Sequence, residues 1–230
     1  EADIAGNLYK IWNRMSSGTY FPPPARAVSI PKKTGGERIL GVPTVSDRIA
    51  QMVVKQAIEP ELEPIFLPDS YGYRPAKSAL DAVGVTRQRC WKYDWVLEFD
   101  IKGLFDNLPH DLLLKAVRRH VQCKWALLYI ERWLTAPMEQ DDGTRIARTC
   151  GTPQGGVVSP TLANIYMNRF LKYWRQSGRN AAYRAHVVSY ADDFVILSRG
   201  HAEEAKTWTG QVMNRLGLTL NEAKTSVRDA

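Results

Sequence analysis

Cysteine is scarce in this sequence and long apolar runs are absent, and both features exclude classes of protein. The 230 residues include three cysteines, Cys90, Cys123 and Cys150, with no CxxC pair among them. An odd number of scattered cysteines argues against a disulfide framework or a cysteine zinc site, and is typical of a reducing compartment. No apolar stretch approaches the roughly 18 residues that cross a bilayer, and the acidic first residues do not resemble a signal peptide. We therefore expect a cytoplasmic protein without a membrane partner.

Several catalytic signatures are missing as well. The four histidines form no HExxH pair, and the chain has neither a GxxxxGK phosphate loop nor a GxSxG turn. These patterns carry zinc proteolysis, P-loop nucleotide binding and serine-hydrolase chemistry. What the chain does have is positive charge: 31 Lys and Arg against 24 Asp and Glu, a net charge of +7. Such a surplus suits a polyanionic partner, nucleic acid before others.

The order of the expected elements favours an α+β fold, because strands and helices mix with hairpins and without a regular βα repeat. Apolar residues at helical spacing predict helices at 2–16, 46–59, 78–90, 111–120, 125–135, 159–176 and 202–216. Short apolar runs predict strands at 26–30, 38–42, 95–101, 186–190 and 194–197, with a weaker hairpin at 137–148. Ser46 and Ser159 are expected as N-caps, and Pro60 as the end of the second helix.

Acidic side chains stand at the ends of two expected strands. Period-two alternation in the strand at 95–101 places Glu98 and Asp100 on one face. Asp192 and Asp193 lie between the last two apolar strands, where adjacent carboxylates repel each other unless a cation compensates or one keeps its proton. Three such carboxylates offer the oxygen ligands that Mg²⁺ prefers. A solvated turn is the alternative for an isolated Asp-Asp pair.

A glycine-rich loop at 151–156 precedes the long helix. The sequence from residue 151 to 160 is GTPQGGVVSP. Its glycines permit close approach of the backbone to a ligand, although a plain loop before a helix has the same composition. In combination with Asp100 and the Asp192-Asp193 pair, in this order along the chain, the loop indicates a functional site.

These motifs resemble those of the reverse transcriptases encoded by bacterial group II introns, a family whose members also act as intron maturases. The resemblance covers almost the whole chain and is carried by VLEFDIKGLFD at 96–106, GTPQGGVVSP followed by LANIY at 151–166, YADD at 190–193 and LGLTLNEAKT at 216–225. It implies the fingers and palm of a right-hand polymerase, with an antiparallel palm sheet packed on helices. It also implies RNA-directed DNA polymerase activity, that is, transfer of a nucleotide from a dNTP to a primer 3′-hydroxyl.

The resemblance further implies a division of the chain and a set of partners. Residues 1–94 would form the fingers with an N-terminal helix, and 95–230 the palm, with part of 110–150 belonging to insertions in either. The thumb and maturase regions of the family would lie beyond residue 230. The expected partners are an RNA template, a DNA or RNA primer and a dNTP in the bacterial cytoplasm, with intron RNA for a full-length protein. Whether the chain forms a homodimer stays open.

Metal binding is the first role that the resemblance assigns to individual residues. Asp100, Asp192 and Asp193 would be catalytic and would hold two Mg²⁺ ions, with Mn²⁺ as a substitute and the carbonyl of Ile101 as an added ligand. A pair of ions about 3.5–4 Å apart can activate an attacking hydroxyl and stabilise a leaving pyrophosphate. Phe105 matches the aromatic gate that excludes a ribose 2′-hydroxyl; its alternative is a core phenylalanine.

Nucleotide contacts are the second role. Lys32 and Arg38 match the triphosphate contacts of the family, with Lys33 as a competing assignment, because phosphate is bound by point charges and fork-shaped donors. Gln154 and Gly155 match the pocket for the incoming nucleotide.

Three charged residues keep open assignments. Lys224 matches a proton donor to pyrophosphate, or is a surface lysine. The roles of Glu98 and Asp106 are not assigned. An RNA-binding maturase with secondary or lost polymerase activity is the alternative function, and an RNA-dependent RNA polymerase is a third, against which Phe105 and the Pro-Gln-Gly loop argue.

Overall fold

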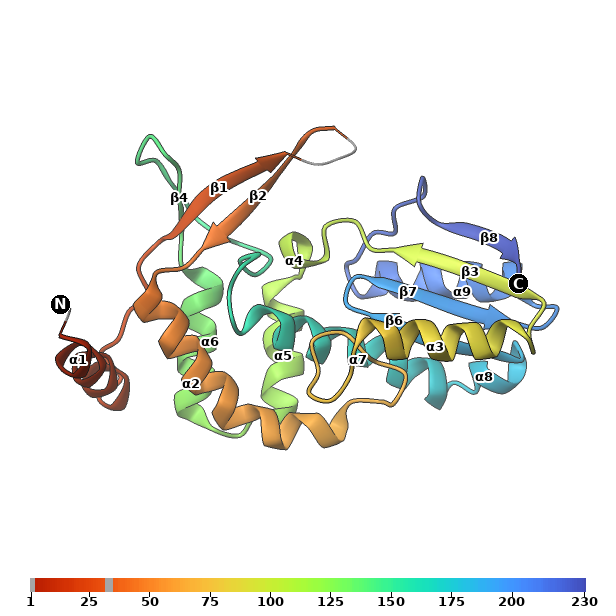
Figure 1. Cartoon of the computed structure of the whole chain (residues 1–230), viewed down its shortest axis with the longest axis horizontal. Coiled ribbons are helices and arrows are strands. Elements are labelled where there is room, and N and C mark those ends of the chain that lie inside the picture. Colours follow the sequence, from red (N-terminus) through yellow and green to blue (C-terminus); the bar gives the residue numbers. More distant parts are fainter. Residues whose placement is uncertain (1–2, 32–34) are drawn as a thin grey trace.

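The computed structural model describes residues 3–31 and 35–230. These residues form an elongated molecule with one four-stranded sheet in each half and helices between and around the sheets (Figure 1). Lys32, an expected triphosphate contact, and Lys33, its competing assignment, lie outside the described residues. No helix within the described ranges is both long enough and apolar enough to span a membrane.

Helices and strands are mixed along the chain, which confirms the expected α+β class. The helices are α1 (Ile4–Ser16), α2 (Val45–Leu62), the 3₁₀ turn η1 (Glu63–Ile65), α3 (Ala79–Cys90), α4 (Leu104–Asn107), α5 (His110–His120), α6 (Lys124–Thr135), α7 (Ser159–Gln176), α8 (Arg179–Ala182) and α9 (Ala202–Arg215). The strands are β1 (Ala25–Pro31), β2 (Glu37–Val42), β3 (Trp95–Asp100), β4 (Met138–Glu139), β5 (Arg145–Ile146), β6 (Ala185–Tyr190), β7 (Asp193–Ser198) and β8 (Ser226–Asp229).

Both ends of α2 differ from the prediction. Thr44, not Ser46, is the N-cap, and its hydroxyl accepts a hydrogen bond from a backbone N–H of the first turn at 3.2 Å. Both residue types are good caps, so the sequence alone could not choose between them. Pro60 lies inside the helix, because it removes only one backbone donor there and the N–H of Glu63 still reaches the carbonyl oxygen of Glu59.

Ser159 is likewise not the N-cap of α7. Val158 holds that position, and the Ser159 hydroxyl donates instead to the carbonyl oxygen of Pro153 at 2.8 Å. The serine therefore ties the glycine-rich loop together. The short elements α4, α8 and β8 were not predicted, since none of them is long enough to show a hydrophobic period.

The first sheet has the strand order β2-β1-β4-β5. β1 and β2 form an antiparallel hairpin, with Arg26 opposite Val42 at its base. β4 lies parallel to the start of β1 and pairs antiparallel with β5. The hairpin expected at 137–148 is therefore part of the sheet that the N-terminal hairpin begins (Figure 1).

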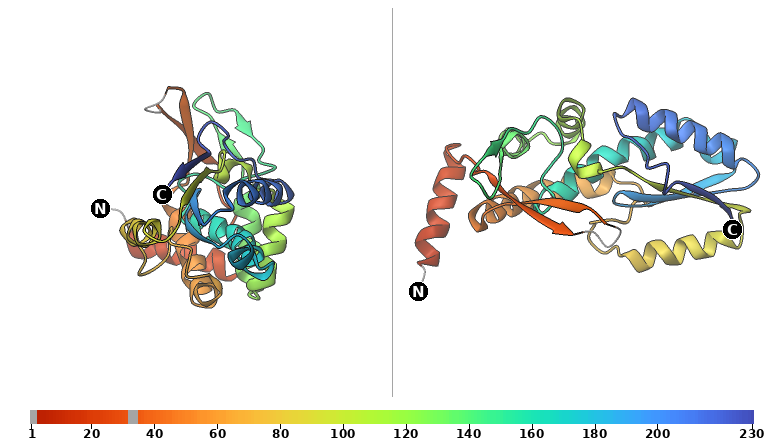
Figure 2. Two further views of the ribbon diagram at one scale, coloured as in Figure 1. Left: turned by 90° about the vertical axis from the view of Figure 1, so that its right-hand side faces the viewer. Right: turned by 90° about the horizontal axis from the view of Figure 1, so that it is seen from above.

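The second sheet has the order β6-β7-β3-β8, with β3 antiparallel to both neighbours. Seen from above, α3 runs along one face of this sheet and α9 along the other (Figure 2). Leu97 and Phe99 of β3 are buried in the core, and the rings of Phe99 and Phe194 stack with their centroids 4.8 Å apart. This packing supports the register that places Asp100 opposite Asp193.

Candidate active site

The three aspartates singled out in the sequence meet at one end of the second sheet. Asp100 ends β3 and Asp193 begins β7, directly opposite each other in the antiparallel register. Asp192 lies in the turn before β7, and its carbonyl oxygen accepts a hydrogen bond from the N–H of the buried Ile101 at 3.2 Å. Strand alternation and the tight turn after β6 thus bring together carboxylates from two distant parts of the chain.

The electrostatics of this group disfavour three negative charges. Desolvation, followed by the carboxylates of Asp192 and Asp100, raises the pKa of Asp193 above its ordinary value, while Lys224 opposes the shift. Like charges this close favour either a retained proton or a bound cation. The end of the sheet is therefore suited to a positively charged partner.

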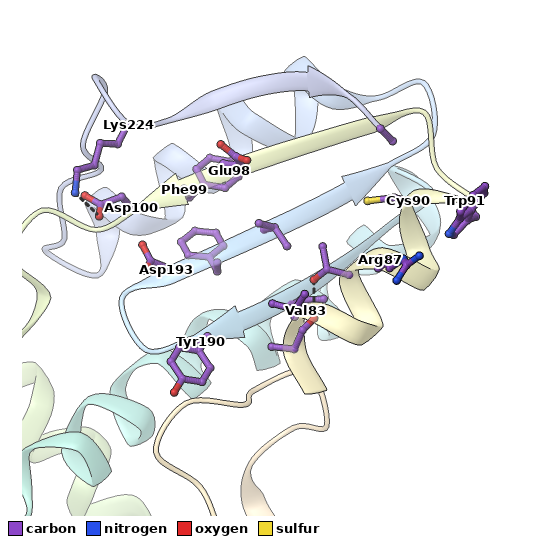
Figure 3. A pocket seen from close by; sticks show the side chains of 16 residues that line it. Val83, Arg87, Cys90, Trp91, Glu98, Phe99, Asp100, Tyr190, Asp193 and Lys224 are labelled. Carbon is purple, nitrogen blue, oxygen red and sulfur yellow. Dashed lines mark hydrogen bonds and ion pairs between the residues drawn. The ribbon is translucent and has the colours of Figure 1, made fainter. Parts of the chain in front are cut away.

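Two neighbours hold the side chain of Asp100. The ammonium of Lys224 lies 3.2 Å from its Oδ1, and the Nδ2 of Asn221 donates to its Oδ2 at 3.0 Å (Figure 3). The backbone N–H of Asn221 also donates to the carbonyl oxygen of Asp100 at 2.8 Å. Lys224 therefore contacts the expected metal-ligand residue, and it is not a surface lysine without a partner.

The donor set fits a divalent cation, although the side chains as they stand do not enclose one. In the part of the chain that the structure describes, no group of three or more His, Cys, Asp or Glu side chains is arranged to hold a metal ion. Carboxylate oxygens on adjacent strands, the raised pKa of Asp193 and a lysine already lying on Asp100 nevertheless all indicate a cation site.

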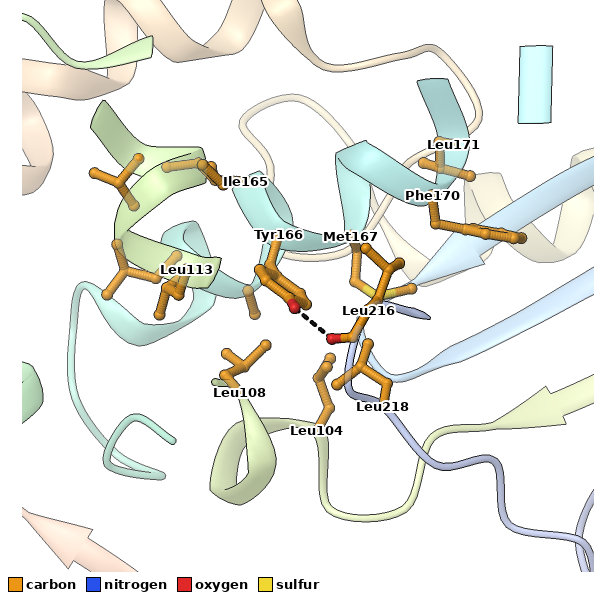
Figure 4. Close-up of a cluster of buried hydrophobic side chains, with 14 of the residues drawn as sticks. Leu104, Leu108, Leu113, Ile165, Tyr166, Met167, Phe170, Leu171, Leu216 and Leu218 are labelled. Atoms are coloured by element: carbon orange, nitrogen blue, oxygen red, sulfur yellow. Dashed lines mark hydrogen bonds between the residues drawn. The ribbon is translucent and has the colours of Figure 1, made fainter. Parts of the chain in front are cut away.

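Phe105 lies on α4, beyond the end of β3, and its main chain is held from two sides. Its carbonyl oxygen accepts a hydrogen bond from the N–H of Thr152 at 2.6 Å. A Cβ on Gly151 would lie 2.5 Å from the carbonyl oxygen of Asp106, so this position, at a φ of +75°, requires glycine. On the other side Leu104 is buried in a cluster with side chains of α5, α7 and the segment after α9 (Figure 4). The predicted gate thus has a fixed backbone.

The loop that carries Gln154 and Gly155 connects α4 with the first sheet. The Nε2 of Gln154 donates to Oδ2 of Asp106 at 2.6 Å. Gly155 has a φ of +118°, and a Cβ there would lie 3.1 Å from the carbonyl oxygen of Gly41 on β2. The two predicted nucleotide contacts are therefore placed between the hairpin of the first sheet and the helix that carries Phe105.

Arg38 lies on β2, where it is exposed and pairs with Ile30 of β1. Burial, followed by Asp192 and Tyr190, raises the pKa of the Tyr73 hydroxyl, while Arg38 opposes the shift. Arg38 and Asp192 thus lie within electrostatic reach of the same hydroxyl group.

The two acidic residues without an assigned role have structural partners. Glu98 accepts a hydrogen bond from the Ser226 hydroxyl at 2.9 Å and lies 3.6 Å from a guanidinium nitrogen of Arg228, so it links β3 to β8. Asp106 accepts the hydrogen bond from Gln154. Both contacts are consistent with positioning neighbouring segments.

A groove of about 920 Å³ begins at the aspartates. Asp100, Asp193 and Lys224 line one end, and Arg87 of α3 and Trp91, directly after α3, line the other (Figure 3). It follows the face of β3 and β7 that α3 does not cover completely. An elongated ligand lying in it would have one end at the carboxylates.

Two residues near the aspartates were missed by the sequence analysis. Asn221 stands in the LNEAKT segment, three positions before Lys224, and could have been examined on that spacing. Tyr73 has a φ of +55°. Positive φ is rare for a residue other than glycine and leaves no pattern in the sequence, so its placement could not have been predicted.

Comparison with known proteins gives consistent results. The family described as "Reverse transcriptase (RNA-dependent DNA polymerase)" matches residues 30–229. Protein YkfC of Escherichia coli K12 is 34% identical over 268 aligned positions, covering 99% of this chain and 69% of YkfC. The group II intron-encoded protein LtrA of Lactococcus lactis is 35% identical, over 72% of this chain and 28% of LtrA.

Among solved structures, telomerase from Candida albicans superposes with a TM-score of 0.72 at 14% identity, over 91% of this chain and 42% of that one. This likeness concerns the fold, and it confirms the expected fingers and palm of a right-hand polymerase. The chain spans less than a third of LtrA and less than half of the telomerase chain.

Proposed function

Because the chain belongs to the reverse transcriptase family, with group II intron-encoded proteins among its homologues, we propose that it catalyses RNA-templated DNA synthesis. The reaction is transfer of a nucleotide from a dNTP to a primer 3′-hydroxyl. The observation that carries the proposal is the meeting of Asp100, Asp192 and Asp193 beside Phe105 and the glycine-rich loop. The proposed partners are an RNA template, a DNA or RNA primer and, for a full-length protein, intron RNA.

The proposed division assigns residues 1–94 to the fingers and 95–230 to the palm. The pairing of β4 with β1 supports placing part of 110–150 with the fingers. The groove beside the aspartates is the proposed place for the primer end, because it leads from the carboxylates along the sheet. The proposed location is the bacterial cytoplasm, where the three free cysteines stay reduced.

A divalent-metal requirement is a general property of the reverse transcriptase family. We place two Mg²⁺ ions, or Mn²⁺ in their place, on Asp100, Asp192 and Asp193 with the carbonyl of Ile101 as an added ligand. When bound, such ions lower the pKa of an attacking hydroxyl and neutralise charge on the leaving group. The carboxylates would hold them, and a cation there would favour the ionised form of Asp193, whose pKa is raised by desolvation and then by the carboxylates of Asp192 and Asp100.

The remaining predicted residues bind and orient the nucleotide. Arg38 and Lys32 hold the triphosphate, with the guanidinium supplying paired donors and the ammonium a point charge. Gln154 and Gly155 line the pocket, and Phe105 excludes the 2′-hydroxyl. Lys224, whose Nζ lies 3.2 Å from Oδ1 of Asp100, would donate a proton to the leaving pyrophosphate.

Primer extension on an RNA template tests the proposal. With Mg²⁺ and dNTPs the chain is expected to extend the primer, and Asp192→Ala should abolish extension while leaving the circular dichroism spectrum unchanged. Extension that survives in Asp192→Ala would contradict the assigned site. RNA binding without extension would support the maturase alternative, and a preference for NTPs would support an RNA polymerase.

A further inference from the structure

The loop between η1 and α3 lies directly beneath the turn that carries the paired aspartates. The N–H of Tyr71 donates to the carbonyl oxygen of Ser189 at 2.8 Å, and the N–H of Ser189 donates to that of Asp69 at 2.8 Å. Asp69 is itself paired with Arg89 and Arg175. These contacts attach the loop to β6 just before the Asp192-containing turn.

Glycine makes the approach between loop and turn close enough. A Cβ on Gly72 would lie 2.5 Å from the backbone nitrogen of Ala191, so no other residue fits there without movement. The Nδ2 of Asn164, from α7, donates to the carbonyl oxygen of Gly72 at 2.8 Å. These contacts hold Gly72 against the turn and against α7, and they therefore set the position of the next residue, Tyr73.

Tyr73 is strained and exposed at the same time. Its φ is +55°, and its side chain is 50% exposed. Strained backbone persists where the surroundings determine it, and such residues cluster at functional sites. Burial does not account for the strain, since the residue is 50% exposed. The position of the ring is the feature that needs an explanation.

The ring contacts two aromatic residues of the site. The rings of Tyr73 and Phe105 pack edge to face, with centroids 6.3 Å apart and planes at 79°. The Tyr190 ring lies 6.5 Å away at 32°. Both distances fall within the range in which aromatic pairs attract each other. Among the ring pairs of the described residues, Phe105 has no partner other than Tyr73.

A gate needs its ring fixed as well as its backbone. The main chain of Phe105 is held by Thr152 and by the close contact at Gly151, but these contacts do not set the direction of the ring. Displacement of a positioning group by about 1 Å is enough to change rates by two orders of magnitude. The partly buried Phe105 side chain packs against the main hydrophobic core, and without the edge of Tyr73 the ring would be free to tilt about that contact.

We propose that Tyr73 is a positioning residue that supports the Phe105 ring and thereby sets the preference of the site for deoxyribonucleotides. This inference rests on the proposed function and deepens it. The Tyr71–Tyr73 segment is attached to the turn that carries Asp192. The Tyr73 ring, which supports Phe105, is therefore held in a fixed position relative to the aspartates. Sugar selection and metal binding are thus carried by one rigid unit.

The test measures kcat/KM for a dNTP and for the matching NTP in the wild type, Tyr73→Ala, Tyr73→Phe, Phe105→Ala and the Tyr73→Ala/Phe105→Ala double variant. Tyr73→Ala should lower the dNTP/NTP ratio about tenfold, mainly by raising kcat/KM for the NTP. Tyr73→Phe keeps the ring and should keep the ratio. The double variant should match Phe105→Ala alone, because Tyr73 acts through that ring.

Tyr9, an exposed tyrosine on α1 beside Trp12, provides the matched control, and Tyr9→Ala should leave the ratio unchanged. Tyr73→Leu fills the volume without an aromatic edge and serves if Tyr73→Ala does not fold. The inference is overturned if Phe105→Ala changes the ratio and the Tyr73 variants slow both nucleotides equally. A wild type that extends no primer would instead contradict the proposed function.

Discussion

At the scale of single residues, Asp100 has two neighbours with opposite consequences for a bound cation. Asn221 donates to Oδ2 and leaves Oδ1 for another ligand, whereas Lys224 places its own positive charge at Oδ1. A hydrogen-bond partner behind a ligand fixes its orientation and raises metal affinity. A competing ammonium lowers that affinity. The two residues therefore act on the same carboxylate in different directions.

Replacing each neighbour should shift Mn²⁺ binding in opposite directions. Asn221→Ala is expected to weaken binding about tenfold, since loss of a ligand's hydrogen-bond partner costs about 10–100-fold in affinity. Lys224→Met should tighten it severalfold, because a competitor is removed. Mn²⁺ titration followed by electron paramagnetic resonance, without nucleotide, measures both.

Thr225→Val is the control for the turn. The Thr225 hydroxyl donates to the carbonyl oxygen of Asn221 at 2.9 Å and does not touch Asp100. It should leave Mn²⁺ affinity near that of the wild type. Equal weakening in Thr225→Val and Asn221→Ala would mean that the turn, and not the amide on Asp100, is what matters.

At the scale of elements, a buried network joins α2 to α6 and to the glycine-rich loop. Asp47 accepts hydrogen bonds from Tyr20 at 2.9 Å and from Trp133 at 2.7 Å on the same oxygen. Its other oxygen accepts from Gln51, whose Oε1 accepts in turn from the N–H of Val157 at 2.7 Å. Helix α2 thus supports the end of the glycine-rich loop through the side chain of Gln51.

Asp47→Ala should lower the free energy of unfolding by about 3 kcal/mol, because it leaves buried donors of Tyr20 and Trp133 without an acceptor. Burial raises the pKa of Asp47 despite its three hydrogen bonds. A carboxyl with a raised folded-state pKa binds protons more tightly in the folded state, so wild-type stability should fall as pH rises from about 4 through that raised pKa. Urea unfolding across this range measures it.

Asp47→Asn removes the ionisable group while keeping its shape. The difference in stability between it and the wild type should change with pH in that window and become constant above it. A difference that stays constant throughout would show that Asp47 has the same pKa in the folded and unfolded chain.

Long elements were predictable from sequence, whereas short ones and local exceptions were not. The helical period of the apolar residues in α7 and the apolar runs of β6 and β7 were sufficient to predict these elements. Thr44 and Ser46 are equivalent as caps by type, and only the folded chain chooses between them. The Asp192-Asp193 pair was visible because polar residues interrupt apolar strands. Tyr73 was not, since its position depends on contacts with Ala191 and Asn164 that are distant in sequence.

At the scale of the whole molecule, the two sheets contribute different groups to one place. The aspartates come from the second sheet, and Arg38, on the hairpin of the first, acts electrostatically on the same Tyr73 hydroxyl as Asp192. The net charge of +7 suits a nucleic acid along the rest of the surface. Contacts with the triphosphate and contacts with the duplex should therefore be separable by mutation.

Arg38→Ala should raise the KM for dNTP about tenfold or more, as expected for loss of a hydrogen bond to a charged group. Affinity for a primer–template duplex should change little. Arg145→Ala is the matched control, because Arg145 belongs to the same sheet, is exposed and pairs with Glu139 at 2.8 Å. Steady-state kinetics and fluorescence anisotropy separate the two effects, and a loss confined to duplex affinity would contradict the assignment of Arg38.

The close approach of Gly41 and Gly155 connects the first hairpin directly to the glycine-rich loop. Its base and the loop that precedes α7 lie so close that a Cβ on Gly155 would be 3.1 Å from the carbonyl oxygen of Gly41, and one on Gly41 would be 3.1 Å from Cβ of Pro153. A movement of the hairpin would therefore act on that loop, and through the hydrogen bond of Thr152 on the helix of Phe105. The proposed triphosphate contact on the hairpin and the proposed sugar gate at Phe105 are thus joined through two consecutive backbone contacts.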